Sequence, residues 1–173
     1  WRPSRTLVLT QAVLAELATL LPIQTTLIEL GDIARPLGGA LSRDELPAEV
    51  EKQLLAIEQA DLLIVAAPVY RGSYPGLLKH LFDLVDINGL IDTPVLLAAT
   101  GGSERHALVL EHQLRPLFGF FQALTLPIGV YAVESDFANY QITSEPLKTR
   151  IRLAAERAAP LFGVSARNLL KIA

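Results

Sequence analysis

Two uninterrupted apolar segments constrain the fold of this chain more than any other feature. They are LLIVAAP, within Asp61–Pro68, and PVLLAAT, at Pro94–Thr100. Short runs without polar alternation are typical of β-strands that are covered on both faces. The segment between them, Gly76–Val85, has the apolar pattern of a helix. Buried strands separated by a helix predict a parallel sheet with helices on both of its faces.

The remainder of the chain continues this alternation. Helices are expected at Ser4–Leu21, Ala48–Ala60, Ser103–Gln122 and Ser144–Phe162. Strands are expected at Ile23–Leu30 and at Ala123–Val133, the latter with a break at Pro127. A loop is expected at Gly31–Pro47. Residues 163–173 receive no assignment. The element order is therefore α-β-α-β-α-β-α-β-α.

This order lacks one strand at its start relative to five βα units. A strand before residue 1 would complete the flavodoxin-like order 2-1-3-4-5, in which strand 1 lies between strands 2 and 3. Without that strand, Ile23–Leu30 and Asp61–Pro68 would have a gap between them in the sheet. The sequence also contains no methionine, and hence no initiator. We therefore predict a single α/β domain over residues 1–173, a flavodoxin-like doubly wound parallel sheet that is N-terminally truncated, with strand 1 missing.

The composition limits the classes of function. The chain has no cysteine, which excludes disulfides, thiolate nucleophiles and cysteine-ligated metals. A formal net charge of −3 without basic runs argues against nucleic acid and anionic membranes as partners. No secretory signal or membrane-spanning run is present, so a cytoplasmic protein is expected. His80, His106 and His112 do not share a helical face at ligand spacing, so no metal site is expected.

Three segments are expected to meet where ligands bind in open parallel sheets, outside the carboxyl ends of the strands. The first is Trp1–Thr6, whose hydroxyls, arginines and helical N–H groups suit a phosphate dianion. Its candidate ligands are Ser4, Arg5 and Thr6, with Arg2 nearby. The alternative is that Ser4 only caps the helix and the arginines are solvated.

The second segment, Pro68–Gly76, follows the first buried strand. The third segment, Thr100–Ser103, follows the second buried strand. Glycine lets the backbone approach a flat ligand closely, and tyrosine offers an aromatic wall or a hydroxyl donor. The candidates are Pro68, Val69, Tyr70, Arg71 and Ser73 in the second segment, and Thr100, Gly101 and Gly102 in the third. The alternative for the second segment is an ordinary turn that leads to a helix beginning near Pro75.

The segments SRT, APVYRGSYPGLLKHLFDLVD and AATGGSERHALVLEHQLRPLF together resemble the NAD(P)H-dependent FMN reductases. The likeness runs from Ser4 to about Val133. It is strongest to the small reductases of two-component alkanesulfonate and methanesulfonate monooxygenase systems. The family's phosphate loop begins upstream of SRT, outside this sequence.

This resemblance implies non-covalently bound FMN, reduced by hydride from NADH or NADPH. Ser4, Arg5 and Thr6 would hold the phosphate. The isoalloxazine would be framed by Pro68, Val69, Tyr70, Arg71 and Ser73, and its other edge would be lined by Thr100, Gly101 and Gly102. Reduced FMN would leave for a partner monooxygenase, and no side chain need act as an acid or base. The family also implies a homodimer or homotetramer. The apolar segment Leu117–Leu124 either belongs to the core or packs in part on another subunit.

One helix carries a local irregularity. Pro116 lacks an N–H for the carbonyl group of His112, so the helix has to kink, widen or supply another partner there. In the reductases resembled here, this helix can carry a one-residue insertion, often a tyrosine, that forms a π-bulge at a subunit contact. We therefore expect a π-bulge at or near His112, on an oligomer interface.

Other functions on the same fold remain open from sequence. A quinone or azo reductase would keep its FMN and reduce a second substrate in place. A flavodoxin-type electron carrier would bind FMN without oxidising NAD(P)H, although such carriers are usually more acidic. A response-regulator domain is disfavoured because Asp61 precedes its strand rather than following it. The residues do not choose between NADH and NADPH.

Overall fold

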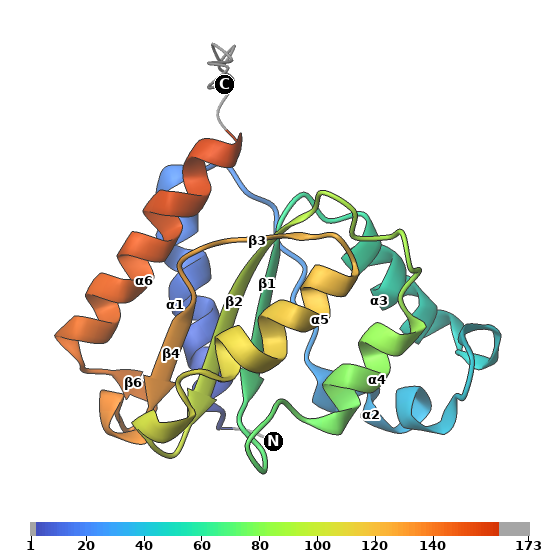
Figure 1. The fold of residues 1–173 in the computed structure, drawn as a ribbon, viewed down its shortest axis with the longest axis horizontal. Helices are drawn as coiled ribbons and strands as arrows, with labels where there is room; N and C mark the ends of the chain where they lie inside the picture. The colour runs from blue at the N-terminus through green and yellow to red at the C-terminus, as the bar shows by residue number, and fades with distance from the viewer. Residues whose placement is uncertain (1–2, 163–173) are drawn as a thin grey trace.

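The computed structural model describes residues 3–162 and has three layers (Figure 1). A central sheet contains β1 (Leu63–Pro68), β2 (Pro94–Gly101), β3 (Leu124–Thr125) and β4 (Val130–Val133). On one face lie α1 (Arg5–Leu20) and α6 (Glu145–Ala158), and on the other lie α2 (Leu30–Gly39), α3 (Ala48–Glu58), α4 (Gly76–Leu84) and α5 (Arg115–Phe120). The predicted strands β1 and β2 and the helices α1, α3, α4 and α6 are thereby confirmed to within a few residues.

The sheet is parallel, and β2 lies at its centre. Ala66 of β1 is paired with Ala98 of β2, and Ala98 is paired with Val130 of β4. The short β3 also pairs with β2, and the break before β4 falls around Pro127, as predicted. This arrangement matches the last three strands of the order 2-1-3-4-5. The strand predicted before residue 1 stays a prediction.

Alternation along β2 divides the core in two. Val95, Leu97 and Ala99 face a cluster built from α2 to α5, whereas Leu96 and Ala98 face one built from α1, β4 and α6. All five side chains are buried. A strand that is covered on both faces has no position at which a polar side chain would reach solvent, and this explains its unbroken apolar sequence.

The strand expected at Ile23–Leu30 is wrong. Ile23–Glu29 has no regular structure, and Leu30 already begins α2. A β-strand needs a neighbour that accepts and donates its backbone hydrogen bonds, and no segment within residues 3–162 pairs with this one. In the predicted order, its only neighbour would be the strand before residue 1.

The loop expected at Gly31–Pro47 is also wrong. This region contains α2 and a 3-10 turn at Arg43–Glu45. Pro36 and the two glycines that end α2 are local helix-breaking signals, but Ile33 and Leu37 are buried against the core. The ring Nε2 of His80, on α4, also lies 3.0 Å from the carbonyl oxygens of both Leu37 and Ala40. Tertiary packing therefore overrides local propensity here.

The helix expected at Ser103–Gln122 is divided into three parts. They are a 3-10 turn at Glu104–His106, a π-helical turn at Leu110–Leu114, and α5. The N–H of Arg115 donates to the carbonyl of Leu110, five residues earlier, which is the bond that defines a π-turn. The predicted π-bulge at His112 is confirmed. The His112 side chain is exposed, and its place at a subunit contact stays a prediction.

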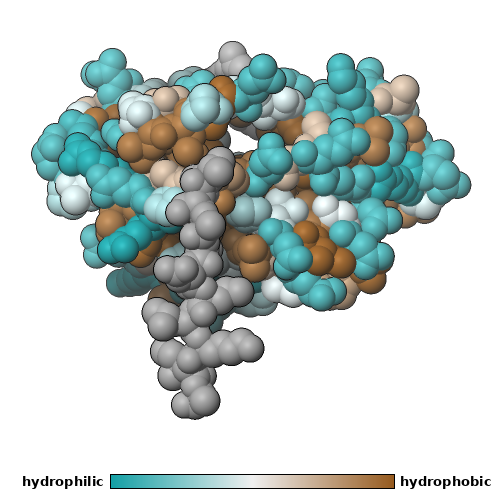
Figure 2. All heavy atoms as spheres, turned by 90° about the horizontal axis from the view of Figure 1, so that it is seen from above, coloured by the Kyte–Doolittle hydropathy of each residue, from teal (hydrophilic) through white to brown (hydrophobic). Residues whose placement is uncertain are grey.

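Two further observations complete the fold. A small hairpin of β5 (Phe137–Ala138) and β6 (Gln141–Ile142), which sequence analysis missed, follows a 3-10 turn at Glu134–Asp136, and a last 3-10 turn at Ala159–Phe162 follows α6. Within residues 3–162, no helix has both the length and the apolarity to cross a bilayer. Figure 2, which views the amino ends of the strands, shows a mainly hydrophilic surface with apolar groups in separate areas.

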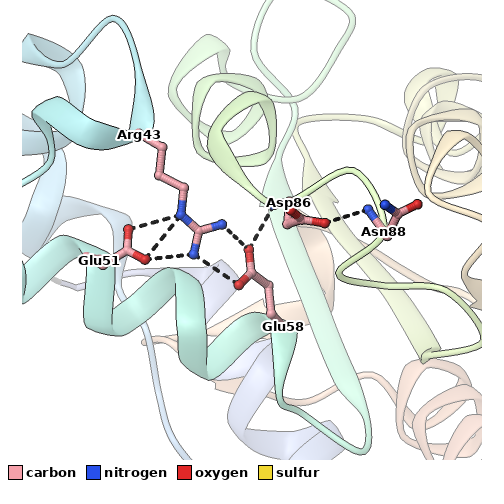
Figure 3. Close-up of polar contacts among 5 residues, drawn as sticks. All are labelled: Arg43, Glu51, Glu58, Asp86 and Asn88. Carbon is pink, nitrogen blue, oxygen red and sulfur yellow. Dashed lines mark hydrogen bonds and ion pairs between the residues drawn. The ribbon is translucent and has the colours of Figure 1, made fainter.

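An arginine between two glutamates joins α3 to the neighbouring turns (Figure 3). Arg43 Nη2 lies 2.7 Å from Glu51 Oε1, and Arg43 Nη1 lies 2.5 Å from Glu58 Oε1. Glu58 Oε1 also accepts a hydrogen bond from the backbone N–H of Asp86. The carboxylates of Glu58 and then Glu51 raise the pKa of Arg43, and Arg43 lowers the pKa of Glu51.

Replacing Arg43 with alanine is expected to lower the free energy of unfolding by about 2 kcal/mol, because two partly buried carboxylates would lose their shared counter-ion. Glu58 is only 12% exposed, so water compensates little for this loss. Urea unfolding measures the change. Arg43→Lys is the control: it keeps the charge but not the two-pronged geometry, and an intermediate loss is expected. Equal stability of R43A and wild type would contradict the prediction.

Candidate active site

Nine of the eleven candidate ligand residues line one cleft at the carboxyl ends of β1 and β2. This cleft has a volume of about 300 Å³. The predicted residues in its lining are Ser4, Arg5, Thr6, Pro68, Val69, Tyr70, Thr100, Gly101 and Gly102. Pro3, Glu134 and Tyr140 complete it. Arg2 lies outside the described residues. The three segments selected from sequence therefore meet in space.

The N-terminus of α1 forms one wall of the cleft. The hydroxyl of Ser4 accepts a hydrogen bond from the N–H of Leu7 at 3.2 Å, so Ser4 is the N-cap. Arg5 and Thr6 begin the helix, and the N–H groups of a first turn have no helical carbonyl to bind. Thr6 Oγ1 lies 2.6 Å from Thr100 Oγ1, which ties α1 to the end of β2. This wall presents hydroxyls, N–H groups and a guanidinium.

The second wall is the segment after β1. The N–H of Val69 donates to the carbonyl of Thr100 at 2.7 Å, and the chain then reverses in a tight turn. Tyr70 and Ser73 exchange two backbone hydrogen bonds across this turn, and Arg71 and Gly72 have φ angles of 53° and 84°. The turn therefore needs left-handed backbone at both central positions. Tyr70 projects from it and is 60% exposed.

The structure places the other two candidates beside the cleft rather than in its lining. Arg71, with Val69 and Tyr70, lines an adjoining hollow of about 310 Å³. The hydroxyl of Ser73 donates to Gln113 Oε1 at 3.0 Å, which links the turn after β1 to the π-helical turn. Ser73 thus fixes the position of the turn through Gln113.

The third wall is Gly101–Gly102, and it is positioned by a tyrosine of β4. Tyr131 Oη donates to the carbonyl of Ser103 at 2.7 Å. Burial raises the pKa of the Tyr131 hydroxyl, so this group stays a neutral donor. A Cβ atom on Gly101 would lie 2.0 Å from Tyr131 Oη, so only glycine fits at this position, whereas a Cβ on Gly102 would meet no atom within 4 Å. The space beside Gly102 is therefore open.

Glu134 and Tyr140 form a further wall of the cleft that was not predicted from the sequence. Arg5 Nη2 lies 2.5 Å from Glu134 Oε1, and the guanidinium carbon of Arg5 lies 5.5 Å from the centre of the Tyr140 ring. Tyr140 is in the turn of the β5–β6 hairpin, where it and Asn139 have φ angles of 57° and 48°. Asn139 was the available signal, because asparagine favours such turns.

The chemistry of this cleft suits binding and orientation. The α1 wall fits a phosphate, and Tyr70 with the glycines fits a flat ring system. Over residues 3–162, no group of three or more histidines and carboxylates is arranged to hold a metal ion. FMN combines a phosphate with a flat ring system, so the residues that line the cleft fit it.

Comparison with known proteins identifies the family. The family model described as NADPH-dependent FMN reductase matches residues 2–138. The NADH-dependent FMN reductase SfnF of Pseudomonas fluorescens is 84% identical over 173 residues, which is all of this chain and 92% of that protein.

Solved structures support the fold. An oxidoreductase from Corynebacterium diphtheriae superposes with a TM-score of 0.80 at 34% identity, covering 93% of this chain and 90% of that one. A flavodoxin, WrbA-like protein from Agrobacterium tumefaciens superposes with a TM-score of 0.62 at 20% identity, covering 90% and 88%. The second likeness concerns the fold alone, and it confirms the flavodoxin-like class. The chain therefore belongs to the family of NADPH-dependent FMN reductases.

Proposed function

We propose that this enzyme binds FMN non-covalently in the cleft, oxidises NADH or NADPH, and releases reduced FMN to a separate flavin-dependent monooxygenase in the cytoplasm. FMN supplies the redox chemistry by accepting a hydride from the nicotinamide. One observation carries the proposal. Residues suited to a phosphate and residues suited to a flat ring come from three distant segments and line one cleft. The assignment of a monooxygenase partner that acts on a sulfonate rests on the family resemblance found in the sequence.

Each wall has a proposed role. Arg5, Thr6 and the first-turn N–H groups of α1 hold the phosphate, and Ser4 keeps this turn in place as its cap. Tyr70, with Pro68 and Val69, borders the isoalloxazine. Thr100, Gly101 and Gly102 border its opposite edge, and Gly102 leaves room there. Arg71 and Ser73 act from beside the cleft, Ser73 by fixing the turn. The protein thus orients the ring, without an acid or base of its own.

The comparisons bear on the choice between NADH and NADPH. The family description names NADPH, whereas the relative at 84% identity is named for NADH. The 84% identity to a relative named for NADH favours NADH for this chain. The distinction depends on contacts to one ribose phosphate, for which the cleft has no assigned group.

A single assay tests the function. Full-length protein is purified, stripped of flavin and mixed with NADH or NADPH at increasing concentrations of free FMN. We expect the rate of nucleotide oxidation to rise with FMN and saturate, because FMN acts as a diffusible substrate. Tight FMN without oxidation of either nucleotide would favour a flavodoxin-type carrier. Activity only with an added quinone or azo compound would favour a reductase that retains its FMN.

The enzyme is also proposed to be a homodimer or homotetramer. Three large side chains near the π-helical turn support this: Leu108 and Phe120 are 61% and 64% exposed, and His112 is exposed as well. Large apolar side chains that are left exposed on a single chain are candidates for subunit contacts. Light scattering of the purified protein measures the mass directly.

A further inference from the structure

A carboxylate of the chain itself binds the arginine that is assigned to the FMN phosphate. Glu134 directly follows β4, lines the cleft and lies 2.5 Å from Arg5 Nη2. Arg5 is the first residue of α1, so Glu134 also lies near the positive end of the helix dipole. This is the place and the partner that a phosphate would take.

The position of Glu134 is fixed by its own turn. Asp136 Oδ2 accepts a hydrogen bond from the N–H of Val133 at 2.8 Å, and the carbonyl of Asp136 accepts one from Thr143 at 2.9 Å. These bonds tie the 3-10 turn at Glu134–Asp136 to both β4 and the end of the hairpin. The Tyr140 ring contacts Arg5 from the same hairpin. The backbone of Glu134 is therefore held near Arg5, and its exposed side chain reaches the guanidinium from there.

This placement has an electrostatic consequence for a ligand with a phosphate group. A phosphate monoester carries about −1.5 to −2 charges at neutral pH, and a carboxylate nearby repels it. The phosphate also has to share Arg5 with Glu134 or displace it. A flavin without a phosphate would experience neither effect. Glu134 is 64% exposed, so it can turn away toward solvent when the phosphate enters.

We propose that Glu134 is an affinity-limiting residue that weakens FMN binding through competition for Arg5 and repulsion of the phosphate, so that FMN and its reduced form exchange readily. The proposal rests on the proposed function and deepens it. It assigns to one residue the choice between flavin as a diffusible substrate and flavin as a retained group. A purely structural residue would lose affinity on substitution, whereas removal of this charge raises it.

The test compares FMN with riboflavin, which has the same ring and no phosphate. Flavin fluorescence titrations measure the Kd of both ligands for full-length wild type, Glu134→Gln and Glu134→Ala. For both variants we expect the Kd of FMN to fall on the order of tenfold, as expected for one charge removed near a dianion in a wet site. The Kd of riboflavin should change less than about twofold, because the ring contacts are unaffected.

Asp83→Asn is the matched control. Asp83 pairs with Lys79 on α4, so its substitution changes the net charge equally without touching the cleft. It should leave both Kd values unchanged. An unchanged or higher Kd of FMN in both Glu134 variants, or an equal gain for riboflavin, would overturn the inference. Failure of wild type to bind FMN or to oxidise either nucleotide would instead overturn the proposed function.

Discussion

Replacing Phe118 with alanine is expected to lower the free energy of unfolding by about 3–5 kcal/mol, the range for large aromatic residues in a well-packed core. Phe118 is fully buried in the cluster between β2 and the helices α2 to α5. Its ring meets Phe82 edge to face, with centroids 4.8 Å apart. Alanine would leave a cavity and remove this contact. Urea unfolding, followed by circular dichroism, gives the change directly.

Phe120→Ala is the matched control, two residues away on the same helix. Phe120 is 64% exposed, so its loss should change the free energy of unfolding by about 0.5 kcal/mol or less. If Phe120 lies in a subunit contact, as the homo-oligomer proposal allows, its substitution would lower the mass measured by light scattering. A small effect of F118A would contradict the description of this core.

Replacing Gly101 with alanine is expected to weaken FMN binding about thirtyfold, which corresponds to about 2 kcal/mol. The new Cβ would overlap Tyr131 Oη, at 2.0 Å, so the ring or the loop has to move. Movement of the ring breaks the hydrogen bond from Tyr131 to Ser103, and movement of the loop shifts the third wall of the cleft. The titration used for wild type measures the effect.

Two further variants separate this clash from a general effect of alanine. Gly119→Ala adds the same methyl group on α5, where a Cβ meets no atom within 4 Å, and it should leave the Kd of FMN unchanged. Gly101→Ala combined with Tyr131→Phe removes the overlapping oxygen, so part of the affinity should return. The two substitutions are therefore expected to be non-additive. Additive losses would show that the clash is not the cause.

Much of this protein could be predicted from local sequence. The apolar runs of β1 and β2 reflect burial on both faces, and Ser4 caps α1 because its hydroxyl reaches an N–H three residues on. An irregularity in this helix was predictable because Pro116 cannot donate to His112, and its form as a π-helical turn was expected from the family resemblance. The convergence of three loops followed from the rule that parallel strands end at one edge of the sheet.

The parts that sequence could not decide depend on contacts between distant residues. Ile23–Glu29 has the composition of a strand but no partner within residues 3–162, and α2 forms despite Pro36 because Ile33 and Leu37 are buried. Glu134, in the 3-10 turn after β4, pairs with Arg5 although the two residues are 129 positions apart in the sequence. Periodicity and capping act over a few residues, so the sequence by itself determined the two buried strands, most of the helices and the place of the cleft. Only the tertiary structure decided which strands found partners and which carboxylate pairs with Arg5, because pairing and electrostatics depend on distance in space.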